Sequence, residues 1–87
     1  SQIDCRDGGD ELVRDVQFSE DGRWILVAKQ AGVHVIDRRR GVKTHFTPLF
    51  GAVQARFVAS TRQVIIQGRT AVHWFTFDHE LGRIMST

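Results

Sequence analysis

Short runs of apolar residues alternate with polar, glycine-containing turns along most of the chain. In the first half, these runs have either the two-residue period or the continuous apolar centre that is typical of β-strands. No stretch shows a helical stripe of useful length. The pattern therefore predicts four strands, at residues 13–18, 24–28, 33–36 and 43–47.

The segments between these runs have the composition of tight turns. Asp21-Gly22 is a strong hairpin signal, because such a turn needs positive backbone angles that Asp and Gly tolerate. Residues 30–32 and 38–41 each contain a glycine and separate the next pairs of strands. The run 24–28 is almost continuously apolar, which predicts a strand buried on both faces.

The second half of the chain repeats the first at a shift of 39 residues. Apolar classes match in three separate segments, and four pairs are identical: Phe18/Phe57, Arg23/Arg62, Val33/Val72 and His34/His73. Near the end the shift becomes 41, since Asp37 matches Asp78 and Gly41 matches Gly82. A repeat of about 40 residues is the length of one four-stranded unit rather than of the shorter helical repeats.

The second copy predicts strands at 53–58, 63–67, 71–77 and 83–86. Pro48 cannot donate an amide hydrogen bond, so we expect it in a linker between the copies. We interpret 12–48 as the first unit, 49–87 as the second, and 1–11 as the last strand of a preceding unit plus a loop. A small sandwich and an open barrel are the alternative all-β folds.

Residues 16–23, Val-Gln-Phe-Ser-Glu-Asp-Gly-Arg, resemble the first hairpin of WD-repeat and related β-propeller blades. Residues 33–37, Val-His-Val-Ile-Asp, look like the end of the third strand, where that family commonly has Trp-Asp. The resemblance covers residues 12–87 in two copies. It implies an all-β fold of two four-stranded antiparallel blades, forming an incomplete propeller or part of one.

The chain departs from the family pattern in several places. The Gly-His pair expected before the first strand is missing, and only Gly8-Gly9 lies nearby. The turn 30–32 has no Asp, and Ser60-Thr61 replaces Asp-Gly in the second copy. The buried network of His, Ser or Thr, Asp and Trp that the family builds is therefore not expected here in its usual form.

Two blades do not close a ring, so we expect apolar blade faces to need covering. Without a cover, the apolar surfaces of Trp24, Leu26, Val33 and Val35 would meet water. The missing blades would come from the rest of a longer parent protein, from further copies of the chain, or from a partner protein. In each case the chain is not a free monomer.

Composition narrows the choice of function without selecting one. The chain has 87 residues, 41% of them hydrophobic and 25% charged, and a formal net charge of +2, which suits a globular unit of one domain or less. Cys5 has no partner for an internal disulfide, and no apolar stretch approaches the length that spans a membrane. These features favour an intracellular location. The start at Ser1 without a leader is expected of a piece of a longer protein.

Arg38, Arg39, Arg40 and Lys43 form the densest charge cluster and are the candidate binding residues. Their position on a turn would let them approach phosphates or an acidic partner, although solvated turn charge is the simpler explanation. No aromatic residues are interleaved with them, so stacking on bases is not supported.

The remaining polar residues give no catalytic or metal-binding pattern. His34 and His73 share a repeat position but would lie about one blade apart, and neither they nor His45 and His79 have cysteine or carboxylate neighbours at ligand spacing. The carboxylates form no recognisable acid-base pair: Asp10, Glu11, Asp15, Glu20 and Asp21. Gly8, Gly9, Ser19 and Ser60 are interpreted as turn residues and Cys5 as an edge-strand residue. Trp24 and Trp74 could anchor a partner, but their place inside apolar strands favours packing within the blades. We therefore predict no cofactor, no metal and no catalytic residue.

These observations predict a protein-interaction or scaffolding segment that holds a partner on loops at one rim. The loops expected at one end are 8–11, 29–31, 49–51 and 69–70, and those expected at the opposite end are 19–22, 38–41, 59–62 and 78–82. Two alternatives stay open: part of a propeller enzyme with its active site in the central channel, and a phosphate- or nucleic-acid-binding module using the basic turn 38–43.

Overall fold

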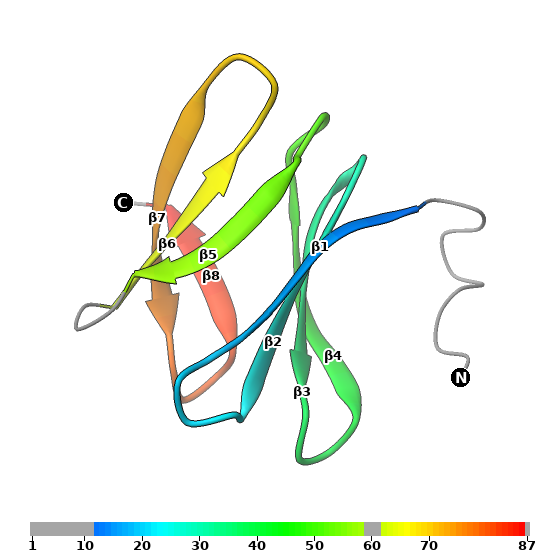
Figure 1. The fold of residues 1–87 in the computed structure, drawn as a ribbon. Coiled ribbons are helices and arrows are strands. Elements are labelled where there is room, and N and C mark those ends of the chain that lie inside the picture. Colours follow the sequence, from blue (N-terminus) through cyan, green and yellow to red (C-terminus); the bar gives the residue numbers. More distant parts are fainter. Residues whose placement is uncertain (1–11, 59–61, 87) are drawn as a thin grey trace.

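The computed structural model describes residues 12–58 and 62–86, and these residues form two four-stranded antiparallel sheets (Figure 1). The strands of the first sheet are β1 (Val13–Phe18), β2 (Trp24–Lys29), β3 (Gly32–Asp37) and β4 (Val42–Pro48). Those of the second are β5 (Gln54–Val58), β6 (Gln63–Gln67), β7 (Val72–Asp78) and β8 (Arg83–Ser86). Each sheet is a meander in which sequence neighbours are also neighbours in space.

The predicted strands agree with the observed ones to within a residue at either end. Pro48 is an exception to the expectation of a linker, because it is the last residue of β4 and lies opposite Gly32. An edge strand tolerates a proline, since its outer side makes no ladder hydrogen bond. The strand expected at residues 3–5 lies outside the described residues. Within the described ranges there is no helix long and apolar enough to cross a membrane.

A hairpin forms around Asp21-Gly22 as predicted, but its connection comprises residues 19–23 and is longer than the tight turn that the sequence suggests. Gly22 has a φ of 76°, and the Asp21 carboxylate accepts hydrogen bonds from the Ser19 hydroxyl at 2.6 Å and the Arg23 amide at 3.0 Å. The Ser19 hydroxyl oxygen also accepts a bond from the amide of Trp24 at 3.0 Å. This local network fixes the point at which β2 begins.

One face of each sheet is buried against the other sheet. On β2 and β3 burial alternates, so the expectation of a strand buried on both faces is wrong for β2: only one face is fully covered. The covered residues form one apolar core: Trp24, Leu26, Ala28, Val33, Val35, Ala52, Ala55, Val64, Ile66, Phe77 and Ile84. Thus the four side chains expected to need a cover, on β2 and β3, receive it from the second sheet of the same chain.

Polar contacts tie the two sheets together along both edges. On the β1 edge, Asp15 and Gln17 accept hydrogen bonds from the amides of Ala55 at 3.3 Å and Phe57 at 2.7 Å. On the β4 edge, the Thr44 hydroxyl donates to the carbonyl of Gly82 at 2.7 Å. These bonds satisfy backbone groups of the second sheet that its own ladder leaves open.

The contact between Trp24 and the β7–β8 turn leaves no room for a side chain at Gly82. The backbone of Gly82 has a φ of 67°, and a Cβ there would collide with the Trp24 ring. Gly41 holds the matching position in the first sheet with a φ of 68°, yet a Cβ there would meet nothing within 4 Å.

We predict that Gly82→Ala destabilises the fold more than Gly41→Ala does. Both variants carry the backbone cost of a positive φ, which is about 1–2 kcal/mol. Only Gly82→Ala adds the overpacking of Trp24, which is typically a further ~1–3 kcal/mol. Urea unfolding monitored by tryptophan fluorescence measures the difference, and equal losses for the two variants would contradict the packing of the sheets described above.

Candidate functional site

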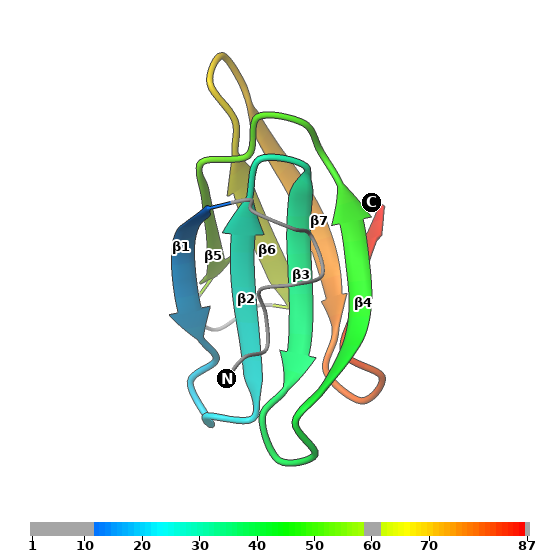
Figure 2. The ribbon, with the colours of Figure 1, turned by 90° about the vertical axis from the view of Figure 1, so that its right-hand side faces the viewer.

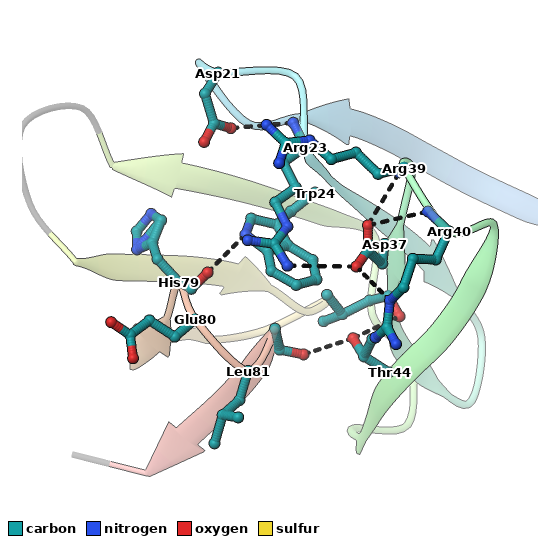
Figure 3. A network of polar contacts seen from close by, with 12 residues as sticks. Asp21, Arg23, Trp24, Asp37, Arg39, Arg40, Thr44, His79, Glu80 and Leu81 are labelled. Carbon is teal, nitrogen blue, oxygen red and sulfur yellow. Dashed lines mark hydrogen bonds and ion pairs between the residues drawn. The ribbon is translucent and has the colours of Figure 1, made fainter.

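Asp37, at the end of β3, is the centre of a charged cluster at one end of the sheets (Figure 3). Its carboxylate is fully buried and lies 3.1 Å from Nε of Arg40 and 3.5 Å from Nη2 of Arg23. It also accepts hydrogen bonds from the backbone amides of Arg39 at 3.0 Å and Arg40 at 3.4 Å. A buried carboxylate is tolerated here because charge and hydrogen bonds surround it.

Opposing effects act on the acidity of Asp37. Burial raises the pKa of its carboxyl, but the Arg40 side chain, the amides of Arg40 and Arg39 and the charge of Arg23 together outweigh burial. The net effect holds the pKa below its ordinary value of 3.8, so the group is ionised at neutral pH. The charge of Arg40 is therefore partly compensated within the chain.

The structure brings the predicted binding residues together around the β3–β4 turn. Arg38 donates to the carbonyl of Gly22 at 3.3 Å and lies over the ring of Phe18 at 5.8 Å, so it links two turns. Arg39 is exposed on the turn, and Lys43 is exposed on β4. The cluster is thus partly structural, through Arg38 and Arg40, while Arg39 extends into solvent.

Sequence reasoning missed Asp37 as the residue that organises this turn. The available signal was its position, which corresponds to the Asp of Trp-Asp in the family pattern. Its repeat counterpart Asp78 binds the amides of Glu80 at 2.9 Å and Leu81 at 3.0 Å, and these two bonds are the leading cause of its lowered pKa. The shared role is to cap the turn that follows the third strand.

The opposite end of the sheets is a rim built from three turns, residues 29–32, 49–53 and 68–71, which we call the upper rim (Figure 2). The segment 49–53 crosses from the first sheet to the second. Its Leu49 and Gly51 amides donate to the β2–β3 turn, at 3.0 Å to Ala31 and 2.6 Å to Gln30. The Val53 amide donates to Gln67 of the second sheet at 2.8 Å. Backbone hydrogen bonds thus hold the upper rim in place.

A shallow hollow of about 160 Å³ lies in the upper rim. Its lining comes from two of the loops that the sequence predicts at this end, and consists of Leu49, Phe50, Gly51, Gly68, Arg69, Thr70, Ala71 and His73. The side chain of Phe50 is 81% exposed, more than any other large hydrophobic residue in the described ranges. The predicted loop 8–11 lies outside the described residues.

The other candidates have local contacts. The ring of His34 packs against Phe46 at 4.6 Å, and that of His73 lies 6.5 Å from Phe75. Burial and then the charge of Arg83 lower the pKa of His45. In the described ranges no three His, Cys, Asp or Glu side chains form a group that could hold a metal ion. Cys5, Gly8, Gly9, Asp10, Glu11 and Ser60 lie outside the described residues.

The two tryptophans of the chain have different surroundings. Trp24 is 1% exposed and packs between the sheets, as the sequence predicts. Trp74 is 51% exposed on the outer face of β7, so the expectation of packing is not met for it within this chain. The difference follows from position, since Trp24 faces the second sheet and Trp74 faces away from the first.

Comparison with known proteins identifies the architecture. No protein-family model matches the chain, and no curated protein matches it significantly. Among solved structures, Hsv2 of Kluyveromyces lactis superposes with a TM-score of 0.66 at 12% identity, over 77% of this chain and 22% of that chain. A second, KlHsv2 with loop 6CD replaced by a Gly-Ser linker, gives 0.64 at 10% identity over 88% and 26%.

Hsv2 is a β-propeller protein. The two sheets have the fold of propeller blades. The chain spans 22–26% of the length of these propeller chains, and at such low identity the likeness concerns the fold alone. We therefore refer to β1–β4 as the first blade and β5–β8 as the second.

We predict that Asp37→Asn lowers the melting temperature at pH 7 by roughly 5 °C or more. The variant leaves Arg23 and Arg40 without their counter-charge. The repeat-matched control Asp78→Asn should lower the melting temperature less, because an amide oxygen still accepts the two backbone hydrogen bonds at that site. A melting series in circular dichroism at pH 7 measures both variants. Equal losses would show that the ion pairs do not stabilise the blade.

The pH dependence of stability provides a second readout. Since the pKa of Asp37 is lower in the folded state, its stabilising contribution is present above the ordinary pKa of 3.8 and is lost as pH falls through the folded value. Asp37→Asn should therefore reduce the loss of stability between neutral pH and pH ~3. If the variant loses as much stability on acidification as the unaltered chain does, that result would contradict a lowered pKa at this residue.

Anion binding by the basic turn stays a prediction, and Arg39 and Lys43 test it best because Asp37 keeps its arginine partners when they are changed. If the turn binds polyanions, Arg39→Gln combined with Lys43→Gln should shorten retention on heparin and flatten its salt dependence. Arg69→Gln at the opposite end is the control. Equal retention of the double variant and the control would reject the assignment.

Proposed function

We propose that the chain is a protein-interaction segment of a β-propeller scaffold, made of divergent WD-repeat-like blades, which holds a protein partner on its upper rim. The propeller fold supports the scaffold part of this proposal, because blades form a rigid framework that carries variable loops. The partner part rests on the exposed Phe50 beside the hollow. A large aromatic side chain that extends from a fixed rim has the chemistry of an interface anchor.

The surroundings of Phe50 favour binding of a peptide segment over binding of a small molecule. The hollow is shallow and small, whereas pockets for small ligands enclose at least ~300 Å³. Its wall combines the apolar Leu49 with exposed polar residues, Arg69 and Thr70. An apolar side chain of a partner would fit between Leu49 and Phe50, and its backbone would meet the polar groups.

The experiment is a selection of binding peptides on the folded chain, followed by affinity measurements on variants. Phe50→Ala should weaken binding of the selected peptides about ten-fold or more, which corresponds to ~1.4 kcal/mol. Leu81→Ala is the matched control, because Leu81 is also an exposed hydrophobic turn residue, at 56%, but lies at the opposite end. Binding that is insensitive to Phe50, or equally sensitive to Leu81, would contradict the proposal.

A further inference from the structure

Each blade keeps one apolar face that no part of the described chain covers. On the first blade this face includes Val16 and Phe18, which are 47% and 52% exposed. On the second blade it includes Val72 and Trp74, which are 53% and 51% exposed. The two sheets lie side by side (Figure 1), so these two exposed faces, which we call the bare faces, lie on opposite sides of the pair. Contiguous apolar faces of this kind mark interaction surfaces.

The repeat makes the two bare faces counterparts of the two that already pack together. At the shift of 39 residues, Trp74 on the bare face of the second blade corresponds to Val35, which is 0% exposed against that blade. Val72 corresponds in the same way to the buried Val33. The bare face of the second blade therefore matches, on β7, the β3 row of the face that the first blade uses to hold its neighbour, whereas on β6 Gln63 stands at the position of Trp24 and Gln67 at that of Ala28.

The reverse correspondence holds for the first blade. Val16 corresponds to Ala55, which is 1% exposed in the formed contact, and Phe18 corresponds to the partly buried Phe57. Ile25 and Val27 on β2 match the buried pair Val64 and Ile66 on β6 in the same register. Hence the chain carries apolar residues of both halves of one blade-to-blade contact, one half at each side.

We propose that the bare faces are covered by further copies of this chain, docked head to tail through the same contact that joins its own two blades. A second copy carries, on its two sides, a counterpart for the apolar residues of each bare face. A head-to-tail contact closes into a ring when its rotation is compatible with closure. Propeller rings contain 4–8 blades, so roughly two to four copies of a two-blade chain would complete one.

The polar edge of the contact can be partly reproduced between copies. Gln54 occupies the position of Asp15, so its side-chain oxygen can accept a bond from the Val16 amide of the next copy, as Asp15 does from Ala55. Arg56 occupies the position of the acceptor Gln17, and its guanidinium cannot accept a hydrogen bond. Within the chain, Nη2 of Arg56 lies 3.9 Å from Oδ1 of Asp15. The contact between copies thus depends more on apolar side chains than the contact between the two blades of one chain does.

The test uses two variants that each block one face. Val16→Asp places a carboxylate on the bare face of the first blade, and Trp74→Asp places one on that of the second. Both side chains are about half exposed in the single chain, while their counterparts Ala55 and Val35 are buried, so each variant should keep its fold and lose one contact. Circular dichroism checks the fold, and Leu81→Asp is a charge control on neither face.

Sedimentation velocity gives the readout. The unaltered chain and Leu81→Asp should sediment as assemblies whose mass exceeds that of one chain, and each blocked variant alone as a monomer. An equal mixture of the two blocked variants should give a species of two chains and nothing larger, because each supplies the face that the other lacks.

Three results would overturn the proposal: an unaltered chain that is monomeric at every concentration, a blocked variant that still dimerises through like faces, or a mixture that stays monomeric. A monomeric unaltered chain would mean that blades of another sequence cover the faces. These outcomes do not depend on Phe50, which lies on the upper rim, so the proposed partner site can fail or hold separately.

Discussion

The packing of Trp24 against the second blade is the contact on which the arrangement of the two sheets depends. Its indole N–H donates to the carbonyl of His79 at 3.1 Å, and its ring meets Phe77 edge to face at 6.0 Å between centroids. Trp24 is 1% exposed, and its large aromatic surface is buried because the β7–β8 turn packs against it. This contact adds an anchor at the β7–β8 turn to the apolar core that both sheets share and to the hydrogen bonds along their edges.

The charged cluster beside Trp24 supports the same corner. Arg23 lies over the Trp24 ring at 4.4 Å and at the same time faces the buried carboxylate of Asp37. Asp37 in turn fixes the β3–β4 turn through the amides of Arg39 and Arg40. Charge and apolar packing are therefore coupled here, and two of the arginines that look like a binding patch in the sequence have a structural role in the fold.

The sequence was sufficient to locate the strands but not to assign their faces. Strand positions follow from local period and turn residues such as Asp21 and Gly22, which need no distant partner. In the run Trp24–Ala28 both faces are apolar, so which face is buried depends on the side on which the second sheet packs. The Asp37–Arg23 pair and the hollow between residues 49–51 and 68–71 likewise join positions far apart in the chain, which a local pattern does not encode.

Native-state hydrogen exchange tests most directly whether the two blades form one unit through Trp24. We expect the Trp24 indole N–H to open with the same free energy as the central amides of β2 and β6, because separating the blades exposes the core that both sheets share and neither sheet then keeps its ladder. An indole N–H that exchanges as fast as a solvent-exposed one, or blades that open with separate free energies, would contradict it.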